Sequence, residues 1–266
     1  MIKKRLIPCV IIVVVTLGCV LLSRFTRVGF FLVLALMSAF ELQNVLFAAD
    51  MPTSKALMCV YIILQAIACW VHAPVIYMAA LLGAAAFAAM FWGILNPDRG
   101  AKFASANLFA LMWPFAFYGA ILYVAASDAW LPTLTLAVLG AWACDSMALV
   151  GGKFFGKHKL APYVSPNKTW EGTIIGGAFA ILAGALIGWL LGGTIGVPTG
   201  VCVITAFVAS CFGQAGDLAA SLIKRMAGVK DYGHLMPEHG GIMDKTDSML
   251  FAIPVAYLCL FVLGWA

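Results

Sequence analysis

Apolar stretches separated by short polar ones run through almost the whole chain. Nine of them approach the roughly 17 to 25 residues that an α-helix needs to cross a bilayer. They lie at about 6–22, 28–49, 56–71, 73–95, 105–126, 129–150, 172–192, 197–213 and 249–266. The pattern predicts an all-α, polytopic integral membrane protein with about nine transmembrane helices.

The composition excludes a soluble globular protein. Hydrophobic residues make up 64% of the 266 residues and charged residues 10%, whereas about half of a soluble domain is apolar. No internal repeat, low-complexity tract or soluble linker interrupts the pattern. We therefore expect a single membrane domain over residues 1–266.

Basic residues in the short polar segments indicate the orientation of the helices, because such residues concentrate on the cytoplasmic side of a membrane. If the N-terminus is cytoplasmic, every lysine and arginine except Arg24 and Arg27 falls on that side. The sequence thus predicts a cytoplasmic N-terminus and, with nine helices, a C-terminus outside. The net charge of +5 suits anionic headgroups or nucleotides, and nothing suggests a nucleic-acid partner.

The densest group of charged residues lies at 216–247, between two apolar stretches. It contains five acidic and four basic residues: Asp217, Asp231, Glu238, Asp244, Asp247, Lys224, Arg225, Lys230 and Lys245. In an arbitrary polar loop, ion pairs that only keep the loop soluble would explain such a group. The spacing of these residues, however, suggests chemistry.

A helix is expected over 216–226, ended by the glycine two residues later. At about 100° per residue, Asp217, Ser221 and Lys224 fall on that helix within an arc of roughly 60°. Arg225 lies just beside this arc. One face therefore combines a carboxylate, a hydroxyl and two cations, and it could hold a metal and a phosphate.

The end of the charged segment adds two features. A His-Gly-Gly run at 239–241 lets backbone amides approach a ligand closely. Asp244 and Asp247, three residues apart, share one face if the next helix begins there. Two separated aspartates, Asp217 and Asp244, then suggest a site for a hard cation.

Two carboxylates lie inside apolar stretches, where an ionisable group costs on the order of 2.5–3.5 kcal/mol. Glu41 is in the second stretch and Asp145 in the sixth, both towards the predicted cytoplasmic side. For Glu41, a hydrogen bond that packs helices and a functional role both stay open. Asp145 is the stronger functional candidate because a polar segment follows it.

That second polar segment contains residues suited to a phosphate. Lys168 carries a point charge, and Ser165 or Thr169 can offer a hydroxyl. Pro166 favours a turn. By themselves these are ordinary loop residues.

Both polar segments resemble those of one enzyme family. The first has the order Ser221-x-x-Lys224-Arg225-x4-Lys230-Asp231-x-Gly233-x3-Pro237-x-His239-Gly240-Gly241-x-x-Asp244-x-x-Asp247. The second has Asp145-x-x-Ala148-x3-Gly152-Lys153-x-x-Gly156, followed by Ser165-Pro166-x-Lys168-Thr169-x-Glu171-Gly172. Together they resemble the signature of the phosphatidate cytidylyltransferases, or CDP-diacylglycerol synthases. The resemblance covers about 130–266, the expected active-site half, and departs from the family at Leu149, Met236 and Lys245.

The resemblance implies a reaction of CTP with phosphatidate that yields CDP-diacylglycerol and diphosphate in phospholipid biosynthesis. Mg²⁺ would be the metal, with a second cation such as K⁺ near the same carboxylates. The carboxylates proposed to hold metal are Asp217 and Asp244, with Asp145 and Asp247 as further candidates. The proposed phosphate-binding cations are Lys168, Lys224, Arg225 and Lys230. The remaining proposed substrate-binding residues are Ser165, Thr169, Ser221, His239, Gly240, Gly241 and Lys245.

The resemblance also implies a homodimer in the inner (plasma) membrane of a bacterium, with the active site on the cytoplasmic face. Two other classes of function stay open. A CTP-dependent membrane lipid kinase would use similar residues but would release CDP. A transporter could use intramembrane carboxylates to relay ions, although these carboxylates gather towards one membrane face and not at the midplane.

Overall fold

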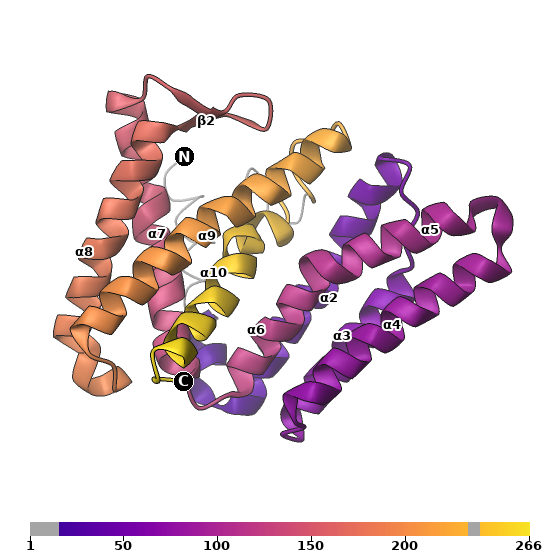
Figure 1. The fold of residues 1–266 in the computed structure, drawn as a ribbon, viewed down its shortest axis with the longest axis horizontal. Coiled ribbons are helices and arrows are strands. Elements are labelled where there is room, and N and C mark those ends of the chain that lie inside the picture. The colour runs from indigo at the N-terminus through magenta and orange to yellow at the C-terminus, as the bar shows by residue number, and fades with distance from the viewer. Residues whose placement is uncertain (1–15, 234–239) are drawn as a thin grey trace. The chain divides into compact units, whose positions relative to one another are not determined.

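The computed structural model describes residues 16–233 and 240–266, and Figure 1 draws their helices and strands. Nearly all of these residues are helical, as predicted. The elements are α2 (Arg24–Ala48), α3 (Lys55–Trp70), α4 (Val75–Leu95), α5 (Pro97–Ala110), η1 (Leu111–Phe115), α6 (Ala116–Ala126), α7 (Trp130–Phe155), β1 (Lys159–Ala161), β2 (Ser165–Thr169), α8 (Trp170–Ile195), α9 (Thr199–Met226) and α10 (Met243–Val262).

Within the described ranges, seven helical segments are long and apolar enough to cross a membrane. They are α2, α4, the continuous run Gly100–Ala126, α7, α8, α9 and α10. Helix α3 is apolar but shorter, with 16 residues. The prediction of a polytopic membrane protein is therefore confirmed. The first predicted helix, 6–22, lies mostly outside the described residues, so the count of nine stays a prediction.

The chain divides into two compact units. The first contains the described residues up to Ala39 together with Ser54–Ala126. The second contains Phe40–Thr53 and Ser127–Ala266, which are the end of α2, helices α7 to α10 and the two strands. The second unit carries both polar segments.

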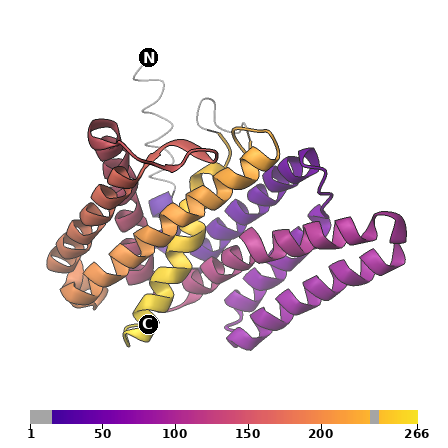
Figure 2. The same ribbon diagram turned by 45° about the horizontal axis from the view of Figure 1, so that its top comes forward.

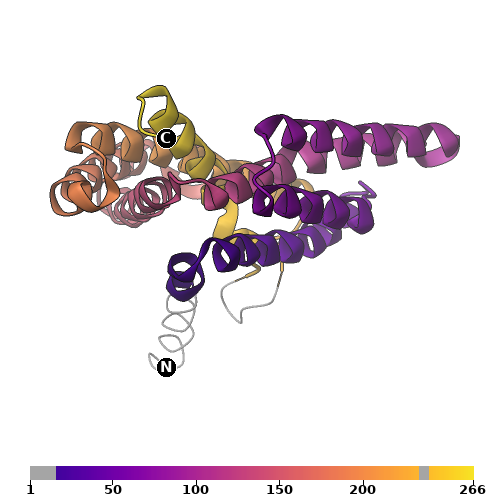
Figure 3. The same cartoon turned by 90° about the horizontal axis from the view of Figure 1, so that it is seen from below.

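In the first unit, the two arginines that depart from the charge pattern bind the C-terminal ends of helices. The Nε of buried Arg27 donates to the carbonyl of Ala125, one residue before the end of α6, at 2.6 Å. Arg24 donates to the carbonyl of Cys69 near the end of α3. Because cations stabilise the last carbonyls of a helix, a local structural role explains both exceptions. In the same unit, α4 and α5 lie side by side (Figure 3).

In the second unit, α8 packs closely on both α7 and α9 (Figure 1), and glycines form the tightest contacts. A Cβ added at Gly172 would lie 2.6 Å from the carbonyl oxygen of Ala148 on α7. A Cβ added at Gly188 would lie 2.6 Å from the Cα of Thr199 on α9. Only a glycine permits such an approach, so these positions serve helix packing.

Helices α9 and α7 of the second unit run well beyond the predicted apolar stretches. Helix α9 runs without a break from Thr199 to Met226, although the hydropathy pattern separated an apolar stretch at 197–213 from a helix at 216–226. Helix α7 likewise continues to Phe155, five residues beyond the predicted end at 150. Hydropathy falls before these helices end, but no residue there breaks the helical hydrogen bonding. Gly228, with φ of +69°, follows α9 at the predicted position.

The short antiparallel hairpin of β1 and β2 was not predicted, because the segment lacks the alternation typical of strands. The turn also lies elsewhere than expected. The amide of Val164 donates to the carbonyl of Ala161 at 3.2 Å, which places Pro162 at the turn position that favours proline. The predicted turn at Pro166 is therefore wrong, since Pro166 lies within β2. Figure 2 shows the hairpin extending towards the C-terminal part of α9.

Candidate active site

Helices α9 and α10 cross closely at the start of the first polar segment. A Cβ added at Gly216 would lie 2.6 Å from the carbonyl oxygen of Asp247. This approach brings Asp217 and Asp247 within electrostatic range of one another. Two carboxylates from separate helices are thus placed together by a contact that only glycine allows.

Asp244, at the start of α10, is held by three donors. Its Oδ1 accepts from the Nζ of Lys224 at 2.7 Å. Its Oδ2 accepts from the backbone amides of Tyr232 at 2.8 Å and Gly241 at 2.9 Å. The Lys224 and Asp244 side chains are only 10% and 8% exposed, so this is a nearly buried ion pair. Helix α10 begins at Met243, which meets the condition under which Asp244 and Asp247 share one face.

Asp217 is paired with a lysine from the second polar segment. The Nζ of Lys168, on β2, lies 2.7 Å from Oδ2 of Asp217, while the hydroxyl of Ser221 donates to Oδ1 at 3.3 Å. The buried Lys168 ammonium is in ion-pair contact, but it makes no well-aligned hydrogen bond. Asp145, on α7, lies within electrostatic range of both Lys168 and Asp217. The structure therefore brings the two predicted segments together.

Asp247, on α10, is the fourth carboxylate of this group. It is buried, and its Oδ1 accepts from the amide of Ser248 at 2.7 Å and from the hydroxyl of the same residue at 3.2 Å. It lies within electrostatic range of Asp217 and Lys224. Four carboxylates, from α7, α9 and α10, thus lie within ion-pair or electrostatic range of two lysines.

Tyr232 is a member of the site that sequence reasoning missed. Its hydroxyl donates to the carbonyl of Ala220 at 3.0 Å, and the Lys224 ammonium lies 5.4 Å from the centre of its ring. Burial, reinforced by the charges of Asp244 and Asp247, raises the pKa of the Tyr232 phenol. The neutral ring covers one side of the Lys224 ammonium, a favourable cation–π contact.

The donor chemistry of the site fits a hard divalent cation. When ionised, the four carboxylates Asp145, Asp217, Asp244 and Asp247 outnumber the ammonium groups of Lys168 and Lys224 by two charges. Among the residues that the structure describes, no three acidic, histidine or cysteine side chains are close enough to enclose a metal by themselves. Mg²⁺ does not need such an enclosure, because it usually binds one or two carboxylates and takes its other oxygens from water and phosphates.

Three of the predicted cations do not join the buried group. Arg225 is exposed and donates to the carbonyls of Val164 and Val229, each at 3.3 Å. Lys230 and Lys245 are also exposed. Although Lys245 is next to Asp244 in the chain, the cation that binds this aspartate is Lys224.

The remaining predicted substrate-binding residues have different structural roles. The hydroxyl of Thr169 caps α8 by accepting from the amide of Gly172 at 3.1 Å. Ser165 begins β2, and Gly240, with φ of +79°, forms the turn beside Asp244. His239 lies outside the described residues.

Glu171, in the first turn of α8, holds the second polar segment in place. Its Oε2 accepts from the amides of Lys157 at 3.1 Å and His158 at 3.2 Å. Its Oε1 lies 2.6 Å from the Nδ1 of His158. Glu171 thereby ties the end of α7 to the start of α8, on either side of the hairpin that carries Lys168.

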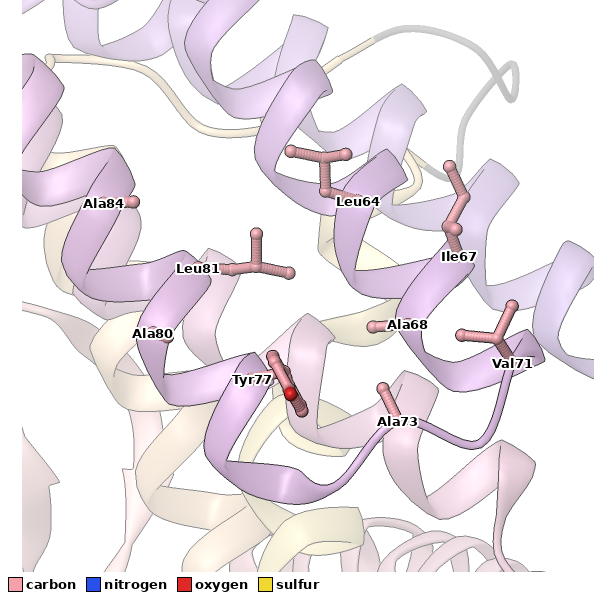
Figure 4. Close-up of a pocket in the computed structure, with 9 residues that line it drawn as sticks. All are labelled: Leu64, Ile67, Ala68, Val71, Ala73, Tyr77, Ala80, Leu81 and Ala84. Carbon is pink, nitrogen blue, oxygen red and sulfur yellow. The ribbon is translucent and has the colours of Figure 1, made fainter.

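An apolar groove of about 410 Å³ lies away from these residues, in the first unit. Its wall is formed by α3 and α4 and includes Leu64, Ile67 and Leu81, with Tyr77 as the polar exception (Figure 4). It contains no charged side chain, so it does not suit a nucleotide.

Comparisons with known proteins agree with the motifs. A family model described as the Cytidylyltransferase family matches residues 3–263. A protein of Staphylococcus aureus (strain COL) named phosphatidate cytidylyltransferase is 32% identical over 262 residues, which cover 97% of this chain and 98% of that protein. The protein of the same name from Staphylococcus haemolyticus (strain JCSC1435) is 30% identical with the same coverage.

A third protein with this name, from Brucella abortus biovar 1 (strain 9-941), is 41% identical over 128 residues. That alignment covers 47% of this chain and 46% of the Brucella protein. In this alignment, the chain spans about half the length of the Brucella protein.

Proposed function

Because the chain belongs to the cytidylyltransferase family, we propose that it is a phosphatidate cytidylyltransferase, which converts CTP and phosphatidate to CDP-diacylglycerol and diphosphate. The observation that carries this proposal is the pairing of Lys168 with Asp217 and of Lys224 with Asp244. Lysines and carboxylates gathered beside apolar helices suit a reaction between a nucleoside triphosphate and an anionic lipid.

The proposed reaction exchanges one bond to phosphorus for another. An oxygen of the lipid phosphate forms a bond with the α-phosphorus of CTP. The bond from that phosphorus to the bridging oxygen breaks, and diphosphate leaves with its electron pair. No protein base is needed, because a phosphate monoester has a second pKa of about 6 and is ionised near neutral pH.

The main obstacle is repulsion between two anionic substrates, and the lysines offset it. An ammonium has three N–H donors, so Lys224 can hold Asp244 and still donate to a phosphate oxygen. Lys168, which makes no well-aligned hydrogen bond of its own, is suited to donate in the same way. Donors placed in advance around a transferring phosphoryl group stabilise its transition state.

Asp217 and Asp244 would hold Mg²⁺, with Asp145 and Asp247 nearby, and a second cation such as K⁺ could lie beside the same carboxylates. Bound Mg²⁺ would neutralise charge on the phosphate oxygens. Arg225, Lys230 and Lys245 are exposed and would meet the outer phosphates of CTP. Ser221 orients Asp217, while Ser165, Thr169, His239, Gly240 and Gly241 would contact the substrates.

We further propose a homodimer in the inner membrane of a bacterium, with nine transmembrane helices, a cytoplasmic N-terminus and the active site on the cytoplasmic face. The basic residues of both polar segments support this orientation. Anionic headgroups and cytoplasmic CTP would then meet at the ends of α7, α9 and α10.

The test is the product formed from CTP labelled separately in its α- and γ-phosphates. Purified protein in detergent is incubated with Mg²⁺, phosphatidate and either label, with Asp244→Asn as the inactive control. The proposal expects the α-label in the lipid and the γ-label in diphosphate. In a parallel incubation with a long-chain lipid alcohol in place of phosphatidate, a γ-label in the lipid with release of CDP would instead identify a lipid kinase. No nucleotide turnover at all would favour a transporter.

A further inference from the structure

Glu41, near the C-terminal end of α2, contacts the candidate active site from the other end of the chain. Its Oε1 accepts from the amide of Ile242 at 2.9 Å, and its Oε2 accepts from the amide of Met243 at 2.8 Å. These amides stand at the start of α10, where the first N–H groups of a helix have no partner within the helix. The negative charge of Glu41 also suits the positive end of the helix dipole.

The backbone of two glycines fits closely around the Glu41 carboxylate. A Cβ added at Gly233 would lie 2.6 Å from Oε1, and one added at Gly241 would also meet the carboxylate. Gly233 directly follows Tyr232, and Gly241 directly precedes Ile242. One carboxylate therefore lies against Gly233, before the His-Gly-Gly run, and binds the amides of Ile242 and Met243, directly after it.

The amides next to these contacts are those that hold Asp244. Tyr232 and Gly241 both donate to its Oδ2, and each is adjacent in the chain to a residue that contacts Glu41. We propose that Glu41 is a positioning residue for Asp244: it holds the start of α10 so that these two amides keep the aspartate against Lys224. This inference rests on the proposed role of Asp244 in binding metal.

A role in positioning differs from a role in stability alone. If Glu41 only capped α10, its loss would lower the amount of folded enzyme, and the remaining enzyme would bind Mg²⁺ normally. If it orients Asp244, the folded enzyme itself would bind Mg²⁺ more weakly. Loss of residues that orient metal ligands typically costs about 10- to 100-fold in metal affinity or activity.

The decisive variant is Glu41→Gln, which preserves the shape of the side chain but can accept only one of the two amides through its oxygen. Its matched control is Asn44→Ala, which changes an exposed polar residue of the same helix. Purified proteins in one detergent are compared for maximal rate and for the Mg²⁺ concentration at half-maximal rate. We expect Glu41→Gln to raise that concentration by about ten-fold or more and Asn44→Ala to leave it unchanged. A lowered rate with unchanged Mg²⁺ dependence would overturn the proposal, as would wild-type behaviour.

A second variant decides the question if Glu41→Gln does not fold. Gly233→Ala retains the Glu41 charge but pushes a methyl group towards Oε1, whereas Gly200→Ala adds the same group where nothing lies within 4 Å. We expect only Gly233→Ala to raise the Mg²⁺ requirement. Equal behaviour of the two alanine variants would contradict a role for Glu41.

Hydrogen–deuterium exchange separates failure of this inference from failure of the proposed function. In the Glu41→Gln protein, the amides of the peptide covering 241–246 should exchange faster than in the wild type and in Asn44→Ala. Unchanged exchange would overturn the positioning role whatever reaction the enzyme performs. Faster exchange in a protein that makes no CDP-diacylglycerol would retain the positioning of Asp244 and reject the reaction.

Discussion

Lys224 on α9 and Asp244 on α10 form a nearly buried ion pair of 2.7 Å that joins the two helices of the candidate active site. The two residues are twenty positions apart, near the end of α9 and in the first turn of α10. The same ammonium also faces the ring of Tyr232. Each partner therefore depends on the other for its charge balance.

Removing one partner should destabilise the protein strongly, because it leaves an uncompensated charge in a buried place. We expect Lys224→Met and Asp244→Asn each to cost about 3 kcal/mol of stability and to lower activity by about 100-fold or more. The double variant should be more stable than the sum of the single effects predicts, yet remain inactive. Melting temperatures in detergent and initial rates measure both effects. Strict additivity of the melting shifts would contradict the pairing.

Asp217→Asn should weaken metal binding with a smaller effect on folding than loss of the Lys224–Asp244 pair, because the Lys168 and Asp217 side chains are more exposed, at 23% and 29%, and the amide can still accept from Ser221. The expected result is a rise of about 10- to 100-fold in the Mg²⁺ concentration at half-maximal rate. Asp128→Asn is the matched control, since Asp128 is exposed in the turn before α7. If both variants titrate with Mg²⁺ like the wild type, Asp217 is not a metal ligand.

Lys168→Ala should reduce activity far more than Lys159→Ala, although both residues lie in the same hairpin. Lys168 contacts Asp217, whereas Lys159 is exposed in β1. We expect a fall in kcat of about 100-fold for Lys168→Ala, the effect typical of removing one donor to a transition state. Lys159→Ala should stay near the wild-type rate. Similar losses in both variants would indicate a general effect on the hairpin.

The side-chain positions on α9 could be predicted because they depend on local geometry alone. Residues four apart lie on one helix face, and Ser221 does donate to Asp217. The partner of Lys224 could not be predicted in this way, because Asp244 reaches it from another helix. The sequence also places a second cation, Lys245, directly beside Asp244. The gathering of the carboxylates depends on a helix crossing at Gly216, which periodicity does not reveal.

The β1–β2 hairpin and the contact of Glu41 could not be predicted from the sequence either. The strands have no alternating pattern of polar and apolar residues. Backbone amides that donate to Glu171 hold the segment that contains them. Glu41 is about two hundred residues away from the amides that it binds. A carboxylate in an apolar stretch needs a hydrogen-bonding partner, so the sequence indicated that Glu41 has one. It did not indicate which residues supply it.

The proposed orientation can be tested by labelling single cysteines in a protein whose eight native cysteines have been replaced. Lys157→Cys and Lys230→Cys place the label at exposed positions of the two polar segments, and Asp128→Cys places it at the opposite ends of the helices. Tyr232 is buried and therefore unsuitable for this experiment. A membrane-impermeant reagent added outside should label only Asp128→Cys. Labelling of either polar segment from outside would reverse the topology.

Lys245 offers the last test, because it is adjacent to Asp244 but is not the cation that binds it. The three donors to Asp244 are Lys224, Tyr232 and Gly241, and all three remain when Lys245 is shortened. We therefore expect Lys245→Ala to leave the Mg²⁺ requirement unchanged. It should raise the KM for CTP several-fold if the exposed ammonium meets an outer phosphate.

Lys245→Arg should behave like the wild type, because it keeps the charge and adds the planar fork that suits phosphate. Initial rates over a range of CTP and Mg²⁺ concentrations distinguish these outcomes. A large loss of activity together with a raised Mg²⁺ requirement in Lys245→Ala would show that this lysine supports Asp244 during turnover. In that case the Lys224 pair could not be the main source of charge balance for the aspartate.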